Sequence, residues 1–455
     1  MKISRIIILM MENRSFDHLL GYSTIKDLVG VPSGQTVPLD PSDFTQGTKA
    51  INPNGLDECV DDPLHGFDNI ANQMNGGSMD GWLKECTNEG RDLDNPISMF
   101  TPETAPIINT LAENFAVFDH WYCSVPSSTD PNRAYAMSGT SNAMVTNFNG
   151  TLWSQQSHID WLNERNVTAG GYYQDDLWAL GYFEDYHKDD NAKRIKELDS
   201  FYTDLKSGDL PAYTWLQPRS SVHDDKLPSW QHPDARVSVG EDLIKEVYEA
   251  IRADPWWNET LFVITYDEHG GYYDHVTPPP TVSPDGIDSD NGFRFDGLGI
   301  RVPTIAISPW TAKGVVYNEG EPASNEFDHA SLIRTTNEIF NLDGFMTARD
   351  EWSKSFTGVL TETYRDDTPA TLPDVYGLDK FDRQTEITYQ KSKEINEHLE
   401  GQILMFCKMH YPSSFRENEI CEEAKKENAH VNQEHASKWI IKEQNKMMLA
   451  AGRSI

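Results

Sequence analysis

Two short apolar runs, far apart in the sequence, are each followed at once by an acidic motif. Residues 6–11 (IIILMM) lead into 12–18 (ENRSFDH), and residues 261–266 (LFVITY) lead into 267–275 (DEHGGYYDH). Short runs rich in β-branched and aromatic residues are typical of buried strands in a parallel sheet. Because the carboxyl ends of parallel strands share one edge, where α/β folds bind their ligands, we expect the two motifs to meet there.

Strand and helix signals alternate through much of the remaining chain. This alternation predicts an α/β fold with a mostly parallel, doubly wound sheet and helices on both of its faces. Residues 23–104 are rich in Asp, Asn, Gly and Pro with weak periodicity, so we expect a long irregular excursion there. The expected strands lie at 115–118, 169–173, 212–216 and 300–308, and the expected helices at 107–112, 239–253 and 327–340.

The character of the sequence changes at about residue 386. From there onward it reads as charged, amphipathic helices with few Gly or Pro residues. We therefore predict a main domain over residues 1–385 and a C-terminal helical region over residues 386–455. A chain of 455 residues is long enough for a large core with a smaller appendage.

The chain is strongly acidic, with 38 basic against 72 acidic residues and a formal net charge of -34. This balance argues against nucleic-acid binding, which needs clustered Lys and Arg, and against electrostatic docking on anionic membranes. The longest apolar run, residues 6–11, is far shorter than the roughly 20 residues of a membrane-spanning helix. No small-residue cleavage site follows it, so we expect neither a transmembrane segment nor a signal peptide.

The five cysteines give no metal or redox motif. No two of them have C-x-x-C spacing, and the odd count leaves at least one unpaired thiol. The sequence permits two local disulfides but does not decide whether they form, one between Cys59 and Cys86 and one between Cys407 and Cys421. The fifth cysteine is Cys123.

A hydroxyl residue is expected at the start of a helix, just after the strand at 115–118. In Ser-Thr-Asp-Pro-Asn-Arg at 128–133, Pro131 suits the first turn of a helix. A helix N-terminus stabilises an alkoxide or an attached phosphate, so Thr129 is a candidate nucleophile, with Asn132 and Arg133 placed to hold phosphoryl oxygens. The alternative is that Thr129 is a simple helix cap.

Four residues of the two acidic motifs are candidate metal ligands. Their oxygen atoms suit Mg²⁺, Ca²⁺ or Mn²⁺, and Zn²⁺ also if a histidine lies nearby. A bound cation would activate a hydroxyl of ordinary acidity. The alternative is that each carboxylate at a strand end makes only a cap or an ion pair. The four are Glu12, Asn13, Asp267 and Glu268.

Several histidines lie in turn-like sequence near these motifs. His65, His232 and His275 are candidates to bind phosphate or to donate a proton to a leaving oxygen, although a single histidine is usually structural. Others are expected to brace the site through hydrogen bonds, namely His18, His269, His329 and Asp274.

Taken together, these motifs resemble the phosphoesterase family of non-specific phospholipases C and related acid phosphatases. Their order and spacing agree with the family over about residues 1–345, and the C-terminal helices resemble those of the plant-type phospholipases more loosely. The resemblance rests on residues 12–18, 128–133 and 267–276, with GIRVP at 299–303, ISPW at 307–310 and FDHAS at 327–331.

The resemblance implies an alkaline-phosphatase-like α/β core and assigns roles to the candidate residues. Thr129 corresponds to the family's nucleophile, which forms a phospho-enzyme intermediate. The oxygen ligands Glu12, Asn13, Asp267 and Glu268 would gather around a divalent metal ion and the transferred phosphoryl group, and His65 and His232 would face the phosphate.

The sequence departs from the family at one stretch near His232. Ala235 and Arg236 stand where the family often has a second His and an Asp, so either His232 alone protonates the leaving group or the head-group preference differs. Family members usually begin with a secretion signal, which is not seen here. Secretion and a cytoplasmic location therefore both stay open.

The function expected from this resemblance is that of a phospholipase C-type hydrolase, which cleaves glycerophospholipids to diacylglycerol and a phosphorylated head group through a phospho-threonine. The alternatives are a broad-range acid phosphatase and a non-catalytic lipid- or phosphate-binding protein. Transient contact with a membrane surface would need an apolar rim around the site. The candidates for that rim, with core packing as the alternative, are Trp121, Tyr122, Tyr172, Tyr173, Trp178 and Trp310.

Overall fold

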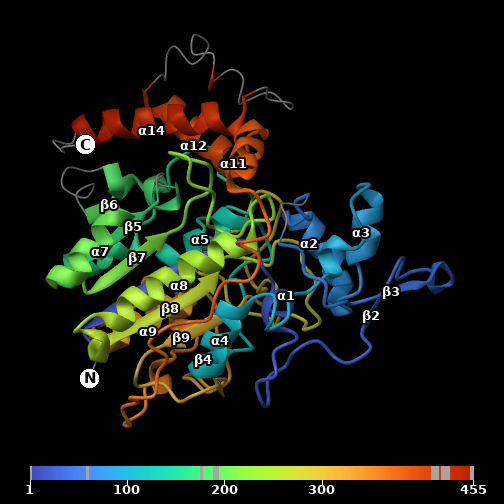
Figure 1. The fold of residues 1–455 in the computed structure, drawn as a ribbon, viewed down its shortest axis with the longest axis horizontal. Coiled ribbons are helices and arrows are strands. Elements are labelled where there is room, and N and C mark those ends of the chain that lie inside the picture. Colours follow the sequence, from blue (N-terminus) through green and yellow to red (C-terminus); the bar gives the residue numbers. More distant parts are fainter. Residues whose placement is uncertain are drawn as a thin grey trace.

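The computed structural model describes residues 3–57, 61–148, 150–174, 178–187, 194–410, 420–421 and 431–450. Its centre is an eight-stranded sheet in the order β10-β4-β9-β8-β1-β7-β5-β6 (Figure 1). The strands are β1 (Arg5–Met11), β4 (Ala116–Phe118), β5 (Ala169–Tyr173), β6 (Ile195–Glu197), β7 (Tyr213–Gln217), β8 (Thr260–Tyr266), β9 (Thr304–Ile307) and β10 (Val315–Val316).

The sheet is mostly parallel, as predicted. Only β9 runs antiparallel to its neighbours, β4 and β8. The two strands that carry the acidic motifs lie side by side, because β1 pairs in parallel with β8 from Arg5 opposite Thr260 to Met11 opposite Tyr266. Both motifs therefore leave the sheet at the same edge. The run of Ile, Leu and Met in β1 is buried on both faces, which explains why it lacks polar alternation.

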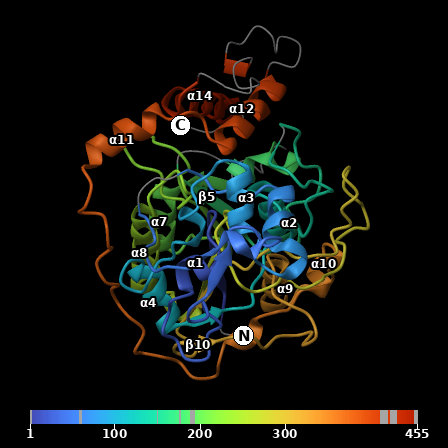
Figure 2. The ribbon, with the colours of Figure 1, turned by 90° about the vertical axis from the view of Figure 1, so that its right-hand side faces the viewer.

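Helices cover both faces of the sheet. Figure 2 shows α4, α7 and α8 on one side and α9 and α10 on the other, with the C-terminal helices above. The predicted helix at 239–253 is present as α8, and its apolar face packs toward the sheet. The helices are α1 (Phe16–Leu20), α4 (Pro106–Asn114), α5 (Thr129–Ser138), α6 (His158–Glu164), α7 (Leu198–Ser207), α8 (Val237–Ala253), α9 (Ala330–Ile339) and α10 (Ala348–Trp352).

The expectation of an irregular excursion over residues 23–104 is wrong in part. This segment contains the antiparallel pair β2 (Thr36–Pro38) and β3 (Thr48–Ala50), and the helices α2 (Phe67–Met74) and α3 (Trp82–Asn88). It has a small apolar core of its own, in which Ile70, Trp82 and Leu83 are fully buried and Trp82 meets Tyr273 edge to face. The helices are too short, and too rich in Asn and Gly nearby, for a helical period to stand out in the sequence.

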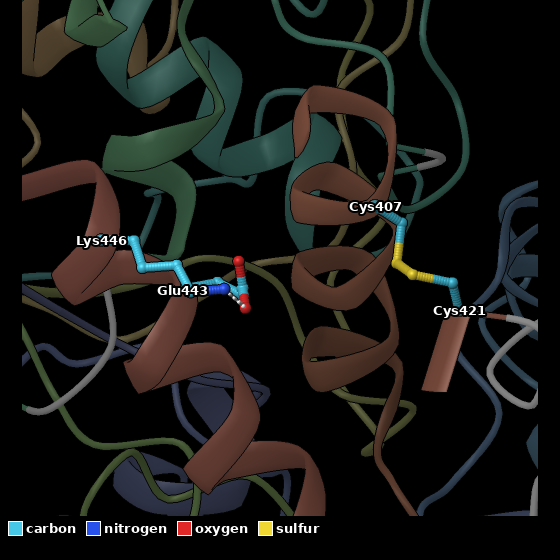
Figure 3. Close-up of a disulfide and its surroundings, with 4 residues drawn as sticks. All are labelled: Cys407, Cys421, Glu443 and Lys446. Atoms are coloured by element: carbon cyan, nitrogen blue, oxygen red, sulfur yellow. Dashed lines mark hydrogen bonds and ion pairs between the residues drawn. A yellow bond between two sulfur atoms is a disulfide. The ribbon is translucent and has the colours of Figure 1, made fainter. Parts of the chain in front are cut away.

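The C-terminal region is helical, as expected, with α11 (Arg383–Ser392), α12 (Glu397–His410) and α14 (Gln433–Ala450). The boundary predicted at 385/386 falls within α11, and the division into two domains stays a prediction. Figure 3 shows the disulfide between Cys407 and Cys421, with the ion pair of Glu443 and Lys446 on α14 nearby. Among the described residues, no helix combines the length and the apolar character needed to cross a membrane.

The remaining cysteine predictions have mixed outcomes. The disulfide between Cys407 and Cys421, which the sequence left open, is present. Cys86 and Cys123 carry buried free thiols, and burial raises the pKa of Cys86 to about 11. Cys59, the partner proposed for Cys86, lies outside the described residues.

Most of the aromatic residues considered for a membrane-contacting rim are core residues instead, which is the alternative given for them above. Trp121, Tyr122, Tyr172 and Tyr173 are at most 3 % exposed and belong to the core, because their strands and loops are covered on both faces. Trp310 donates its indole N–H to the carbonyl of Asn258, next to the start of β8 and so at the opposite edge from the acidic motifs. The side chain of Trp178 is not among those described.

Candidate active site

The two acidic motifs interlock where β1 and β8 end. Asn13 adopts a left-handed backbone with φ 55°, which turns the chain sharply after β1. Its N–H donates to Oδ1 of Asp267 at 3.0 Å. A Cβ atom on Gly270 would overlap the carbonyl oxygen of Asn13, and Gly270 has φ 63°, so glycine is required at this close approach. The predicted meeting of the motifs is present at this edge.

Thr129 is the first residue of α5 and faces this junction. Its hydroxyl donates to Oε1 of Glu12 at 2.9 Å and lies 3.4 Å from Oδ1 of Asn13. The N-cap residue is Ser128, and no side chain caps the helix there. The hydroxyl of Thr129 is therefore committed to the buried carboxylate of another segment, and the simple-cap alternative does not describe it.

Arg133, one helical turn after Thr129, holds two carboxylates together. It is fully buried, forms an ion pair with Glu12, and donates from Nε to Oδ2 of Asp267 at 2.9 Å. Burial and the nearby charge of Asp267 raise the pKa of Glu12, and Arg133 opposes the shift. A carboxylate with a raised pKa beside a hydroxyl is a ready acceptor for the hydroxyl proton.

Two of the predicted residues are held tightly by the protein itself. The Asp267 carboxylate accepts from the N–H groups of Asn13 and Glu268 as well as from Arg133. The Asn132 amide accepts from the N–H of Val125 and donates to carbonyls of the loop before α5, those of Val125, Ser127 and Ser128. Asn132 thereby fixes the turn that presents Thr129, and contact with phosphoryl oxygens stays a prediction.

Glu268 fits a bound cation. It is fully buried, and its Oε2 accepts from the N–H of Gly270 at 2.7 Å. Its Oε1 has no hydrogen-bond partner among the described atoms, and Nε2 of His65 lies 3.8 Å from it. A buried anionic oxygen without a donor is costly, and a divalent cation bound by Glu268 would remove that cost.

Two histidines and an aspartate line the approach to Thr129. His65 places Nδ1 2.7 Å from the carbonyl of Pro63 and Nε2 3.3 Å from Nδ2 of Asn13. Oδ1 of Asp62 lies 3.6 Å from Nδ1 of His65, and Oδ2 of Asp62 lies 3.6 Å from Nε2 of His232. The ligand atoms of these three residues lie within 4.8 Å of one another, so they form a second group able to hold a metal ion.

A pocket of about 320 Å³ opens onto this approach. His65 and Ser128, the residue before Thr129, are among the residues that line it. One part of its wall is polar and the other is apolar, with Phe67 pairing edge to face with Phe293 at 5.0 Å. The lining residues include Asp62, Leu64, Asn69, Arg91, Val145 and Asn147.

His275 belongs to a different cluster. Its Nδ1 lies 2.6 Å from Oδ2 of Asp17, and Asp17 and Asp274 both pair with the fully buried Arg301. Burial raises the pKa of Asp274 to about 6, although Arg301 opposes the shift and Asp17 adds to it. Among the described contacts, none joins His275 to Thr129 or Glu12, so its catalytic role stays a prediction.

The histidines predicted to brace the site are all buried and hydrogen-bonded or stacked. Nε2 of His329 lies 2.6 Å from the carbonyl oxygen of Asp267, and Nε2 of His269 lies 3.0 Å from Oε1 of Gln73. His18 stacks on Tyr272 with ring centroids 3.7 Å apart. Burial lowers the pKa of each of the three imidazoles, which favours neutral rings that hold the backbone of the motifs.

Two acidic residues beside the histidines were missed by the sequence reasoning. Asp62 lies three residues before His65, and Asp234 lies two residues after His232 with its Oδ1 2.8 Å from Nδ1 of that ring. A carboxylate spaced two or three residues from a histidine is a signal that the sequence did contain. It carries little weight in an acidic chain, where such neighbours are frequent.

The site combines a hydroxyl at a helix N-terminus that faces a buried carboxylate, acidic residues able to bind a cation, and two nearby histidines. This combination is that of a hydrolase of the phosphoryl-transfer class. The chain belongs to the phosphoesterase family, whose model matches residues 3–343. It is a phosphoric ester hydrolase.

The relatives are phospholipases. Non-specific phospholipase C3 of Arabidopsis thaliana is 36% identical over 415 residues, which cover 82% of this chain and 76% of the relative. Non-specific phospholipase C6 of the same plant is 34% identical over 99% of this chain and 90% of the relative. Among solved structures, the phosphonate monoester hydrolase of Agrobacterium radiobacter has a TM-score of 0.38 at 10% identity, covering 80% of this chain and 79% of that one.

Proposed function

We propose that the protein is a phospholipase C-type hydrolase, which cleaves glycerophospholipids on the glycerol side of the phosphate. The products are diacylglycerol and a phosphorylated head group. The observation that carries the proposal is the 2.9 Å hydrogen bond to Glu12 from the hydroxyl of Thr129, which directly follows Ser128, a residue that lines the pocket. The names of the relatives, non-specific phospholipases C, support the class of substrate.

In the first step Oγ1 of Thr129 attacks phosphorus, and the hydroxyl proton passes to Oε1 of Glu12. The bond from phosphorus to the glycerol oxygen breaks, and His232 gives that oxygen a proton, so that diacylglycerol leaves as a neutral alcohol. The product on the enzyme is a phospho-threonine. In the second step water attacks phosphorus and His232 takes one proton from the water. The bond from phosphorus to Oγ1 of Thr129 breaks, Glu12 returns the first proton to Oγ1, and the phosphorylated head group leaves.

The remaining residues hold this arrangement. Arg133 keeps Glu12 and Asp267 in place, and Asn13 and His65 lie where the equatorial oxygens of the phosphoryl group would sit. Glu12, Asn13, Asp267 and Glu268 are the proposed holders of a divalent ion. When bound there, such an ion would supply positive charge against the phosphoryl oxygens.

The test compares Thr129→Ala with the wild type on phosphatidylcholine micelles and on p-nitrophenyl phosphate, a soluble monoester. We expect the wild type to release diacylglycerol and Thr129→Ala to lose at least about 1000-fold in kcat with an unchanged melting temperature. A matched control is Thr140→Ala, just beyond the far end of α5, which should keep its activity. Mass spectrometry of rapidly quenched enzyme should find phosphocholine on the peptide with Thr129 when phosphatidylcholine is the substrate, and phosphate when p-nitrophenyl phosphate is the substrate.

Three results would change the proposal. Substantial residual activity in Thr129→Ala, far above one part in about 1000 of the wild-type kcat, would show that Thr129 is not the nucleophile. Turnover of the soluble monoester with none of phosphatidylcholine would favour the broad-range phosphatase. No turnover of either substrate, with each of Mg²⁺, Ca²⁺, Mn²⁺ and Zn²⁺ supplied, would favour a non-catalytic binding protein.

A further inference from the structure

Two exposed asparagines begin the triplet that accepts N-linked glycans. The triplets are 166–168 (NVT) and 258–260 (NET), and the side chains of Asn166 and Asn258 are both exposed. An Asn-X-Thr triplet whose middle residue is not proline accepts a glycan at the surface of proteins that enter the secretory pathway. A third triplet, at 149–151, begins outside the described residues.

Both asparagines lie at the edge of the sheet opposite the active site. Asn166 comes just before β5, and Asn258 comes just before β8. Because β5, β7, β1 and β8 run parallel, their first residues share one edge and their last residues share the other. Thr129 faces Glu12 at the end of β1. A glycan on either asparagine would therefore leave the approach to Thr129 open.

Asn258 differs from Asn166 because it lines a groove with aromatic walls. The groove has a volume of about 560 Å³, and Trp257, Trp310 and Tyr364 are among its lining residues. The rings of Trp310 and Tyr364 meet edge to face with centroids 5.1 Å apart. The indole N–H of Trp310 donates to the carbonyl oxygen of Asn258 at 2.7 Å, which fixes the backbone of the asparagine against this wall.

The chemistry of the groove suits a pyranose ring. One face of such a ring consists of C–H groups that pack on aromatic rings, while its hydroxyls need polar partners at the edge. Tyr364 is 46 % exposed and offers its ring. Arg252 and Asp254 add charged groups to the same lining. An exposed aromatic groove with a polar border is typical of a binding surface.

The disulfide between Cys407 and Cys421 supports passage of the chain through an oxidising compartment. Disulfides form and persist in secreted proteins and in the lumen of the endoplasmic reticulum, which is also where N-linked glycans are added. The disulfide and the groove lie in different parts of the chain, so each supports this compartment independently of the other.

We propose that Asn258 carries an N-linked glycan whose first sugar, N-acetylglucosamine, packs in the groove. The donor is a lipid-linked diphosphate oligosaccharide. Nδ2 of Asn258 forms a bond to C1 of the sugar, and the bond from C1 to the donor phosphate breaks. The lipid diphosphate leaves, and the amide gives up one proton to a base of the transferase. Thr260 is buried in the folded protein, so the transfer precedes the folding of β8.

The attachment is tested on the full-length chain directed into the endoplasmic reticulum of a eukaryotic host. Release of glycans by peptide N-glycosidase F in ¹⁸O-water converts a glycosylated asparagine into ¹⁸O-labelled aspartate. We expect mass spectrometry to find this label at Asn258. The variant Asn258→Asp, which has the residue that the glycosidase leaves behind, should lack one glycan in its intact mass.

The packing of the sugar is measured by the rate at which the same glycosidase releases it from the folded protein. A linkage held against aromatic rings is open to the enzyme for only part of the time. Tyr364→Ser, which removes one ring, should therefore raise the release rate at Asn258 by at least about 5-fold. The control is Tyr376→Ser, at an exposed tyrosine that is not among the described residues of the groove, and it should release at the wild-type rate. Release from Asn166, where that site is occupied, should be equal in the two variants.

Two results would overturn the inference. An unlabelled Asn258 in the secreted chain would show that no glycan is attached, and equal release rates in Tyr364→Ser and Tyr376→Ser would show that the sugar does not pack in the groove. Tyr364→Leu, which keeps the apolar bulk without the ring, gives the same test if Tyr364→Ser does not fold. Neither readout uses phospholipase activity, so the outcome is independent of the proposed function.

Discussion

The side-chain oxygens of Thr129 and Glu12 lie 2.9 Å apart although 117 residues separate them in the sequence. The contact arises because β1 delivers Glu12 to the sheet edge and α5 presents its first residue at the same place. Arg133 secures it, since the guanidinium that pairs with Glu12 sits one turn along the helix that carries Thr129. Thr129, Glu12 and the Arg133 guanidinium that pairs with Glu12 and Asp267 are therefore joined in one buried network.

Replacement of Arg133 by Met should be severely destabilising. The change leaves Glu12 and Asp267 buried side by side without a counter-ion, and removal of one partner from a buried ion pair costs about 3–5 kcal/mol. We expect a clear fall in the denaturant midpoint at pH 7 and loss of phosphoesterase activity. Arg334→Met, at a partly exposed pair with Glu338, is the control and should cost about 1 kcal/mol or less. Comparable denaturant midpoints for the two variants would show that the ion pairs of Arg133 with Glu12 and Asp267 do not stabilise the fold as described above.

Glu268→Gln should abolish the thermal response to a divalent metal. In chelator the substitution removes a buried charge with an unpartnered oxygen, so the melting temperature should stay the same or rise. With metal added, the wild type should gain stability by mass action, about 2.7 kcal/mol at a hundredfold excess over Kd, and Glu268→Gln should not. Glu85→Gln, at another buried glutamate, is the control. An equal metal-induced shift in Glu268→Gln would place the ion elsewhere, with Asp62, His65 and His232 as the next group to test.

Phe293→Ser should weaken the enzyme on lipid aggregates more than on soluble substrate. Phe293 is half-buried and packs against Phe67, which lines the pocket, so the pair offers an apolar surface next to the pocket. Loss of a partly buried phenyl group should raise KM for phosphatidylcholine vesicles by about 10-fold. The value of kcat/KM for p-nitrophenyl phosphocholine should change less than about 2-fold. Phe44→Ser, at a phenylalanine 65 % exposed and remote from the pocket, should leave both unchanged.

The sequence was most informative where chain geometry left little choice. The runs at 6–11 and 261–266 are buried in full, and such runs are stable only as inner strands. From that, the meeting of Glu12 with Asp267 follows, because parallel strands end at one edge. The position of Thr129 at the start of a helix was also foreseen, since Pro131 suits only a first turn.

The sequence was least informative about which way a side chain faces. Tyr172 and Tyr173 alternate along β5, yet both are buried because helices cover both faces of the sheet. They were candidates for a lipid-facing rim, with core packing as the alternative, and the pocket is lined instead by Phe67, which packs against Phe293. Asp62 and Asp234 were missed for a related reason: both lie in irregular loops, whose positions depend on distant helices rather than on local pattern.

Glu241 gives the protein a stability that depends on pH away from the active site. This residue of α8 is buried, and its two oxygens accept from the N–H groups of Ile107 and Ile108 at the start of α4, each at 2.8 Å. Burial raises the pKa of Glu241 to about 7, although these two hydrogen bonds oppose the shift. The folded state thus binds a proton that the unfolded chain, with a glutamate of ordinary pKa near 4.5, has already released.

Because the folded-state pKa is the higher one, the contribution of Glu241 is present in full below about pH 4.5 and is lost as the pH rises toward about 7. In Glu241→Gln this dependence should disappear. As the pH rises over that range, the unfolding free energy of the wild type should therefore fall relative to that of the variant, by an amount on the order of 1 kcal/mol or more. Urea unfolding of both proteins at several pH values measures the difference directly. Glu85→Gln, at another buried glutamate, is the control and should run parallel to the wild type. A constant difference between Glu241→Gln and the wild type over this range would mean that the Glu241 carboxyl ionises as easily in the folded protein as in the unfolded chain.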